Sequence, residues 1–508
     1  MPSRSAPASA ALGVLAMGSG VAVAHLLAAL TIPSRSPLVA VGAAFIDLTP
    51  TWLKEYAVAT FGTADKQVLL GTIATILGLV SAGVGLLARA HRRTAVGLVG
   101  AVGLVAAAAA VSRPGASGAD AVPALLGAAG AAGALALLTR RVRHAAGPGG
   151  TAGPGRRSVV LGVLGVAGLA LVAGSLGEVV GRRRADVSAA RAAVRLPAPD
   201  DPAAALPASV EVGVPGVTPF RVAARDFYRV DTALTVPAVD VTGWTLSVGG
   251  MVDRPYAVSF ADLLAMPLVE RDLTLTCVSN EVGGPYVGNA RWLGVRVKDL
   301  LAHAGVDPRA DQLLSRSVDG WTASTPIAAV TDGRDALVAV AMNGEPLAAE
   351  HGFPARMVVP GLYGFVSATK WLVSLEPSTY SREQAYWTRR GWATDAPVRT
   401  MARIDVPHAL STVAAGRVAV AGVCWAQHRG IDGVELQVDD GPWRAARLGS
   451  VPSDDTWRQW VVTWDATPGR HTLRARATDG TGRTQPEARL TPFPSGAQGW
   501  HEVVVTVA

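Results

Sequence analysis

Apolar residues are concentrated in the first third of the chain, where they form five long stretches. These stretches cover residues 11–31, 68–88, 95–111, 122–139 and 158–180. Each is close to the ~20 residues that an α-helix needs to cross the hydrocarbon core of a membrane. Between Leu69 and Gly181 the only acidic residues are Asp120 and Glu178. The pattern therefore predicts an N-terminal helical membrane domain, with about five transmembrane helices, over residues 1–181.

Basic residues flank these stretches unevenly. Arginines gather between the second and third stretches and again between the fourth and fifth. Because basic loops stay in the cytoplasm, this distribution places the N-terminus inside and everything after residue 181 outside. The three arginines at 182–184 disagree, and we follow the two longer basic loops. We expect a multi-pass protein of the cell membrane whose later domains lie on the extracytoplasmic side.

The stretch at 158–180 directly follows Arg156 and Arg157. Two arginines before a moderately apolar segment rich in Gly and Ala resemble a twin-arginine export signal, although no Phe-Leu-Lys follows them. Ordinary cytoplasmic arginines are the alternative. His25 is the only histidine within an apolar stretch, so the paired histidines that hold a b-type haem are missing. We expect an anchor without haem. The mixed apolar and charged residues of 32–67 are typical of a segment at the membrane surface.

The rest of the chain differs in composition and in its pattern of apolar and polar residues. Residues 182–215 are rich in Ala and Pro, which is typical of an extended linker. Over 216–398, strand-like runs alternate with short helices, expected at 260–264 and 297–301, and this mixture predicts an α+β domain.

Apolar and polar residues alternate in short runs over 399–508, with turn signals such as Asp-Gly between them. We expect strands at 417–425, 434–438, 457–464, 472–477 and 500–507. Strands at this spacing predict an all-β, immunoglobulin-like sandwich of about seven strands.

Composition narrows the classes of function. Two cysteines in 508 residues exclude a disulfide scaffold. The formal net charge of +7 does not indicate a nucleic-acid partner, because much of the arginine flanks the apolar stretches. Lysine is rare in this arginine-rich chain and occurs only as Lys54, Lys66, Lys298 and Lys370. Each lysine is therefore a candidate for a specific role.

Cys277 stands at the end of an apolar strand and before a Gly-rich loop, 281–286. A cysteine at a strand end can present its sulfur to a ligand, and a buried structural cysteine is the alternative. We expect Cys424 to be structural. Three basic residues, His351, Arg356 and Lys370, follow within a short span. Arginine contacts phosphate with two parallel hydrogen bonds and lysine acts as a point charge, so this group indicates anion binding.

Residues 216–508 resemble the sulfite oxidase family of molybdopterin enzymes. The segment 273–294 is similar to the family's cysteine loop. His-Gly-x-Pro-x-Arg at 351–356, followed by Val-Pro-Gly and Lys-Trp, is similar to its pterin-phosphate segment, and Phe-Tyr-Arg at 227–229 to the start of its cofactor domain. The terminal sandwich resembles the family's dimerisation domain, which implies a homodimer.

The resemblance implies a molybdenum–molybdopterin cofactor. Cys277 would bind the metal as a thiolate, since a soft, anionic sulfur suits a metal that shuttles between two oxidation states. His351, Arg356 and Lys370 would hold the pterin phosphate. The resemblance also implies that Asn280, Ser324 and Thr325 contact the cofactor. It implies catalytic roles for Tyr228, Arg229 and Cys277 itself.

The resemblance departs from the family at one place. Glu281 and Val282 stand where sulfite oxidases carry arginines that help to bind sulfite. A carboxylate there repels a dianion, which favours a neutral substrate such as a sulfoxide or N-oxide. We therefore expect a membrane-anchored enzyme that performs two-electron oxygen-atom transfer on a small sulfur or nitrogen oxide or oxyanion. Sulfite oxidation proper is one alternative, and a non-catalytic, membrane-tethered binding or sensor protein is another.

No Cys-x-x-Cys-His motif for haem attachment occurs in the sequence. Electrons must then pass to or from a separate carrier, a quinone or a cytochrome.

Overall fold

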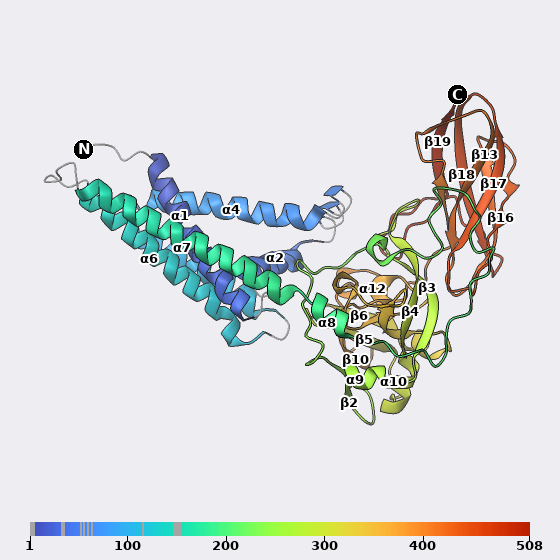
Figure 1. Cartoon of the computed structure of the whole chain (residues 1–508), viewed down its shortest axis with the longest axis horizontal. Coiled ribbons are helices and arrows are strands. Elements are labelled where there is room, and N and C mark those ends of the chain that lie inside the picture. The colour runs from blue at the N-terminus through green and yellow to red at the C-terminus, as the bar shows by residue number, and fades with distance from the viewer. Residues whose placement is uncertain are drawn as a thin grey trace. The chain divides into compact units, whose positions relative to one another are not determined.

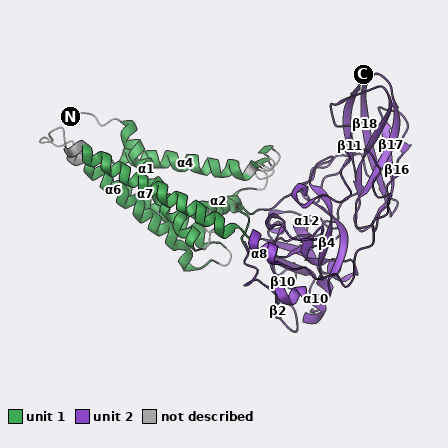
Figure 2. Ribbon diagram, viewed as in Figure 1, with its two compact units in different colours: residues 1–187, 233–238 green, residues 188–232, 239–508 purple. Residues whose placement is uncertain are grey.

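The computed structural model describes residues 6–31, 36–50, 53, 56–57, 60–61, 64–113, 116–145 and 154–508. The chain divides into two compact units (Figure 2). The helical unit comprises residues 1–187 together with 233–238, and the second unit comprises 188–232 together with 239–508. Within the second unit we call residues 239–398 the middle region and residues 399–508 the C-terminal region.

Long apolar helices build the helical unit (Figure 1). They are α1 (Ala6–Leu30), α2 (Pro37–Leu48), α4 (Asp65–Leu87), α5 (Arg92–Val111), α6 (Val122–Ala145) and α7 (Pro154–Ala185), with a short 3₁₀ turn, η3 (Gly118–Ala121). Among the described residues, five helices are long and apolar enough to cross a membrane, as the hydropathy pattern predicts. The shorter α2 falls in the segment expected at the membrane surface. The side chain of Arg156 lies outside the described residues.

Glycines set the close packing of α1 against its neighbours. A Cβ placed on Gly13 would lie 2.1 Å from the carbonyl oxygen of Ser81 in α4, and one on Gly85 would lie equally close to that of Ser9. Between α1 and α6, a Cβ on Gly20 would lie 2.4 Å from the carbonyl oxygen of Gly127. Because these positions carry no side chain, the helix backbones approach closely. Apolar helices in apolar surroundings gain their packing energy from such close van der Waals contact, since the hydrophobic effect does not drive them together there.

The segment 182–215, which its composition predicts to be a tether, is in fact only partly free. α7 continues to Ala185, and α8 (Ser188–Ala193) follows. Beyond them Asp201 forms ion pairs of 2.6 Å with both Arg271 and Arg296. The backbone N–H of Val212 donates to Oε1 of Gln459 at 2.7 Å. Asp201 and Val212 thus bind the part of this segment that follows residue 187 to the rest of the second unit.

The middle region has two mixed layers of strands and short helices. One sheet has the order β2-β1-β10-β5-β6, and the other has the order β3-β4-β7-β8 with β9 paired to β7. The strands are β1 (Thr245–Val248), β2 (Tyr256–Ser259), β3 (Val269–Thr276), β4 (Val287–Arg296), β5 (Gln312–Ser317), β6 (Thr322–Pro326), β7 (Leu337–Met342), β8 (Glu345–Pro346), β9 (Arg356–Val358) and β10 (Leu372–Ser378).

Short helices join these strands. They are η4 (Ala224–Asp226), just before the region, and α9 (Phe260–Leu264), α10 (Val297–Ala304), α11 (Ile327–Thr331), η5 (Ala349–His351), α12 (Gly364–Ser367) and η6 (Thr388–Arg390). The helices predicted at 260–264 and 297–301 are confirmed. β3 and β4 pair antiparallel, with Thr276 opposite Val287, so residues 277–286 form the loop between them.

The C-terminal region consists of two packed sheets. Their orders are β11-β13-β17-β16 and β12-β19-β18-β14-β15. The strands are β11 (Met401–Val406), β12 (Thr412–Val413), β13 (Gly416–Trp425), β14 (Ile431–Val438), β15 (Arg444–Ala445), β16 (Arg447–Leu448), β17 (Arg458–Ala466), β18 (Gly469–Asp479) and β19 (His501–Val507). All five predicted strands are present. The two-residue strands were not predicted, because two residues carry no alternation to detect. The six-residue β11 was also not predicted, and its burial pattern is continuous at first rather than alternating.

Candidate functional site

Cys277 directly follows β3 and begins the loop that leads to β4. Its backbone N–H donates to the carbonyl oxygen of Tyr286 at 2.9 Å, and its own carbonyl oxygen accepts from Asn280 at 3.1 Å. The side-chain Oδ1 of Asn280 accepts from the N–H of Tyr286 at 2.7 Å. Asn280 therefore closes the loop and fixes the backbone at Cys277.

The Cys277 thiol is buried, with 8% of the residue exposed. Burial raises the pKa of the thiol, while hydrogen bonds from Ser279 and the charge of Lys370 oppose this rise. A sulfur in this position becomes a stable thiolate only when a cation compensates its charge.

His351 ends the turn η5 and is 2% exposed. Its Nε2 lies 2.7 Å from the carbonyl oxygen of Ala224, which can only accept, so Nε2 carries the hydrogen. The buried Nδ1 has no hydrogen-bond partner among the described residues. Burial and the nearby charges of Arg356 and Lys370 lower the pKa of His351 to about 4. At neutral pH the ring is therefore neutral and offers an unused acceptor at Nδ1.

Arg356 lies in β9 and is 4% exposed. Its guanidinium donates to the carbonyl oxygens of His351 and Ala368 at 3.2 and 3.3 Å, and lies 5.2 Å from the ring centroid of Trp292. Burial lowers its pKa to about 10, so it remains a cation at neutral pH. In the described part of the chain no carboxylate pairs with this buried charge, which makes it suited to an anionic ligand.

Lys370 lies beside this group and is also buried. Its Nζ donates to Oδ2 of Asp231 at 3.0 Å and to the carbonyl oxygen of Glu350 at 2.9 Å. Burial lowers its pKa to about 8, although the charge of Asp231 opposes that change. Unlike Arg356, Lys370 already has a protein counter-ion.

A glycine allows the three basic residues to meet. Gly352 has φ +109°, and a Cβ there would lie 3.1 Å from Cα of Lys370 and 3.2 Å from Cβ of Arg356. Hydrogen bonds from Met357 to Thr369 and from Leu372 to Ala355 then hold the two segments together. The structure thus brings His351, Arg356 and Lys370 together, as their spacing suggested.

Residues 227–231 cross the same site. Phe227 lies edge-on to His351 at 5.8 Å and stacks on Tyr228 at 5.1 Å between ring centroids. Burial and the proximity of Cys277 raise the pKa of Tyr228, so its hydroxyl stays protonated. Arg229 is exposed, and its Nε donates to Asp231 at 3.0 Å.

Ser324 and Thr325 lie in β6 and are buried, but their hydroxyl groups are engaged within the protein. Ser324 Oγ donates to Oε1 of Gln312, and Thr325 Oγ1 donates to the carbonyl oxygen of Val366 at 2.5 Å. Their hydroxyl hydrogens are therefore not free donors for a ligand.

The sequence interpretation missed Tyr363, Trp292 and Asp231. Tyr363 is 3% exposed, and burial together with the nearby Cys277 raises its pKa to about 12. Its only local signal is an aromatic residue just after Val-Pro-Gly. Trp292 and Asp231 carry no local signal, because each contributes through a partner more than 60 residues away.

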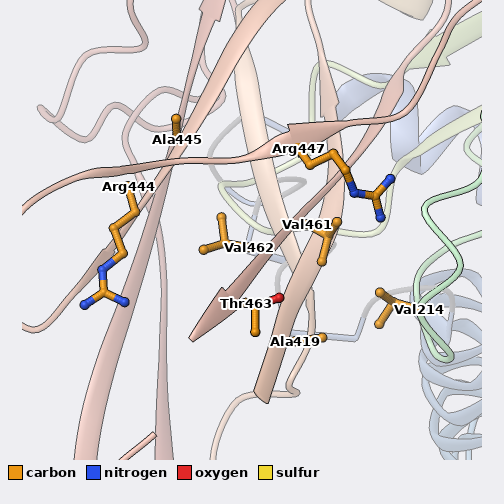
Figure 3. A pocket seen from close by; sticks show the side chains of 8 residues that line it. All are labelled: Val214, Ala419, Arg444, Ala445, Arg447, Val461, Val462 and Thr463. Carbon is orange, nitrogen blue, oxygen red and sulfur yellow. The ribbon is translucent and has the colours of Figure 1, made fainter. Parts of the chain in front are cut away.

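A separate pocket of about 580 Å³ is lined mainly by the C-terminal region and shares no residue with this group. It is lined by Val214, Ala419, Arg444, Ala445, Arg447, Val461, Val462 and Thr463. Figure 3 shows the two arginine side chains pointing away from each other, and Arg447 donates to the carbonyl oxygen of Val212 at 3.1 Å. The pocket therefore lacks convergent polar groups.

Comparison with known proteins assigns the family. Residues 233–387 match the oxidoreductase molybdopterin binding domain. The uncharacterized oxidoreductase YuiH of Bacillus subtilis (strain 168) is 39% identical over 153 residues, which cover 30% of this chain and 74% of YuiH. The chain belongs to the sulfite oxidase family of molybdopterin oxidoreductases. It is thus a molybdenum-dependent oxidoreductase, and the alternative of a non-catalytic binding or sensor protein is set aside.

Other members of the sulfite oxidase family are more distant. Mitochondrial sulfite oxidase of Homo sapiens is 29% identical over 331 residues, covering 54% of this chain and 60% of that protein. This oxidoreductase therefore spans about three fifths of the length of the sulfite oxidase it matches. Among solved structures, the sulfane dehydrogenase SoxCD from Paracoccus pantotrophus has 23% identity and a TM-score of 0.47, covering 54% of this chain and 80% of that chain.

The grouped residues fit a molybdopterin cofactor. A buried thiol, a buried guanidinium without a carboxylate, and a buried imidazole nitrogen without a partner lie within one site. A soft metal would bind the thiol, a phosphate would pair with the guanidinium, and a hydrogen-bond donor of a ligand would bind the imidazole nitrogen.

Proposed function

We propose that this oxidoreductase is anchored in a membrane and transfers an oxygen atom to or from a small substrate at a molybdenum centre ligated by Cys277. The observation that carries the proposal is the buried Arg356, which has no carboxylate partner among the described residues, in the same site as the buried Cys277. The buried guanidinium is costly without an anion, and an anionic ligand beside it would make its burial favourable.

In this proposal the bound molybdenum centre supplies two-electron oxygen-atom chemistry. The chain holds and orients it. Cys277 provides the thiolate, while Arg356 and Lys370 hold the phosphate. Nδ1 of His351 accepts a hydrogen bond from the cofactor, and Asn280 keeps the thiolate loop closed.

The remaining predicted site residues act around the substrate and the cofactor. Tyr228 keeps its proton and donates a hydrogen bond to a substrate oxygen. Arg229 orients Asp231, which in turn fixes Lys370. Ser324 and Thr325 shape the wall of the site through their backbone and packing, since their hydroxyl hydrogens are engaged elsewhere.

The apolar surface of the helical unit supports membrane anchoring. Large side chains such as Leu104, Leu161 and Leu171 are 61–70% exposed on its helices. Exposed apolar surface of this extent is stable only in contact with lipid or another apolar partner. The basic loops support an extracytoplasmic position of the catalytic domain, with Arg156 and Arg157 as an export signal.

The loop after Cys277 supports a neutral substrate. Glu281 is exposed and Val282 is half-buried, in place of sulfite-binding arginines. We therefore propose a sulfoxide or another S- or N-oxide as substrate, with sulfite as the alternative. A separate quinone or cytochrome would exchange electrons with the enzyme, and the immunoglobulin-like C-terminal region would form a homodimer.

The first test uses the full chain, produced with cofactor supply and purified in detergent. We expect about one molybdenum and one pterin per chain, and loss of the metal in Cys277→Ser. Turnover of sulfoxides and N-oxides with a reduced artificial electron carrier, compared with sulfite oxidation, identifies the substrate. Folded protein without metal or pterin would refute the proposal.

The Glu281→Gln variant tests the substrate charge. Removing one exposed like charge should raise kcat/KM for sulfite by about fivefold at low salt, since such pairs contribute up to about 1 kcal/mol. Turnover of a neutral sulfoxide should not change. An equal change for both substrates would remove the argument for a neutral substrate.

A further inference from the structure

The loop that carries Cys277 is held at both ends by side chains of the C-terminal region. These side chains are Gln427, Arg403 and His501, and none has a role in the proposed function. All three contact the middle region within ten residues of Cys277 along the loop and strand.

Gln427 holds the incoming strand. Its Nε2 donates to Oγ1 of Thr276 at 2.8 Å and to the carbonyl oxygen of Thr274 at 3.3 Å. Thr276 immediately precedes Cys277. Gln427 is fully buried, and its Oε1 has no partner among the described residues. A buried amide with one unsatisfied oxygen is an unfavourable choice for packing alone, so its hydrogen bonds to β3 are the reason it fits here.

Arg403 and His501 hold the outgoing end of the loop. Arg403 Nη1 donates to the carbonyl oxygen of Gly284 at 3.0 Å. Gly283 has φ +81°, and a Cβ there would lie 2.2 Å from Nε2 of His501, so the imidazole sits directly on the glycine backbone. Nδ1 of His501 in turn accepts from the N–H of Ile404 at 2.9 Å. Both groups are therefore fixed to β11 and β19 of the C-terminal sheets.

We propose that Gln427, Arg403 and His501 are positioning residues that set where the Cys277 sulfur lies and shield it from solvent. The effect of these residues on a bound metal rests on the proposed function, whereas their effect on the position of the sulfur does not. The position of a ligating sulfur governs its overlap with the metal, and groups that orient a ligand typically change affinity or activity by 10–100-fold. The C-terminal region would thus belong to the catalytic site, although it contributes no group that touches the substrate.

The chain offers a matched control for Gln427. Gln459 is a second buried glutamine of the C-terminal region, 1% exposed. It bonds to Val212 and Thr218, away from the Cys277 loop. Gln459→Leu removes buried hydrogen bonds to the segment 211–218, whereas only Gln427→Leu releases β3 next to Cys277.

The decisive experiment measures thiol alkylation in the full chain without cofactor, with Cys424 as an internal reference. In Gln427→Leu and Arg403→Ala, we expect iodoacetamide to label Cys277 about tenfold faster, since losing a hydrogen bond of about 1.4 kcal/mol gives a tenfold change in local opening. In Gln459→Leu the Cys277 rate should stay at the wild-type value. Cys424 should remain unlabelled throughout.

Three results would overturn the proposal. They are an unchanged Cys277 rate in Gln427→Leu, an equal increase in Gln459→Leu, and a parallel increase at Cys424, which would indicate general unfolding. None of these readouts needs molybdenum, so this failure is separate from a failure of the proposed function.

The loaded enzyme gives a second readout that ordinary destabilisation does not move. In Gln427→Leu we expect retained molybdenum, a shifted sulfur-to-molybdenum charge-transfer band and a kcat lower by about 10–100-fold. Gln459→Leu should keep the wild-type band. A Gln427→Leu enzyme with the wild-type band and kcat would contradict the positioning role.

Discussion

The protein contains two buried cysteines in two contrasting surroundings. Cys424 lies near the end of β13 but inside the apolar core of the C-terminal sheets, and its thiol donates to the carbonyl oxygen of Arg458 at 3.1 Å. Cys277 directly follows β3. The charge of Lys370 affects the pKa of its thiol, and the thiol in turn affects the pKa values of Tyr228 and Tyr363. Burial raises the pKa of both thiols.

The difference teaches that burial alone does not distinguish a functional cysteine from a structural one. Both residues are at most 8% exposed. The neighbouring groups differ: the Cys277 site also buries an arginine that has no carboxylate partner among the described residues, and an imidazole nitrogen that has no hydrogen-bond partner there. Such groups are unfavourable in an apo structure and have a purpose only with a ligand.

The largest contrast is expected from replacing each cysteine by serine. Cys277→Ser should lose bound molybdenum and reduce kcat by more than ~100-fold, beyond the range for residues that merely support a metal ligand. Cys424→Ser should keep both. Metal analysis and turnover of the two full-length variants provide the measurement. Comparable losses in the two variants would erase the distinction between the regions.

The second contrast concerns the arginine near each cysteine. Arg458 is only half-buried, and it donates to the carbonyl oxygens of Gly449 and Ile431 at 2.5 and 2.8 Å. The hydrogen bonds of Arg356 are longer, and no carboxylate among the described residues neutralises its charge. Arg356→Ala should weaken cofactor retention by ~10–100-fold, the value of one or two charged hydrogen bonds.

Arg458→Ala provides the control for that variant. It should lower stability without changing the pterin content, which is measured after gel filtration. Full pterin retention in Arg356→Ala would contradict the role of this guanidinium.

The third contrast is in pH dependence, measured on cofactor-free protein in detergent. His351 binds a proton with a pKa of about 4 in the folded state against 6.5 when unfolded. The unfolded chain therefore takes up the proton first, and stability falls as the pH decreases from about 6.5 to about 4, by on the order of 3 kcal/mol. His351→Gln should reduce this slope, leaving the part due to His501, whose pKa is also about 4.

A histidine of the C-terminal region should behave in the opposite sense. The hydrogen bond from His471 to Asp439, at 2.9 Å, raises the pKa of His471. Its contribution is present at acidic pH and is lost as the pH rises above its folded pKa. His471→Gln should therefore steepen the loss of stability on acidification. An unchanged acid profile in both histidine variants would show that these pKa differences are not realised.

The smallest expected effect is that of Cys424→Ala. It removes one sulfur from a core that includes Trp460 and Leu473, both fully buried. We expect a loss of about 1–2 kcal/mol in the free energy of unfolding, with unchanged activity. Chemical denaturation of the full chain measures it. A loss of cofactor would instead connect this core to the site.

Local patterns were sufficient for much of this architecture. Hydropathy predicts the five long helices, and alternation predicts β13 and β17. The position of Cys277 at a strand end left a structural role open, and the resemblance to the family made it the candidate ligand. The glycine at 352 and the basic residues beside it also mark a site, since they cluster within 20 residues of sequence.

What the sequence conceals are contacts between distant segments. Asp231 meets Lys370 across 139 residues, and Gln427 meets Thr276 across 151. An isolated Asp or Gln has no periodicity, so only the fold reveals such partners. The same limit applies to Ser324, whose hydroxyl is engaged by Gln312 from the neighbouring strand, and to Asp201, which binds Arg271 and turns a presumed linker into a packed segment.

The glycines between α1 and its neighbours determine which substitutions the helical unit can tolerate. Gly, Ala and Val codons differ at a single base, so one point change can replace a glycine with a larger apolar residue and leave the hydropathy of the helix almost unchanged. At Gly71 or Gly78, where nothing lies within 4 Å of an added Cβ, such a change is harmless. At Gly13 or Gly85 the same one-base change would force two backbones apart. Variation in this unit should therefore be ranked by the space at each position and not by polarity.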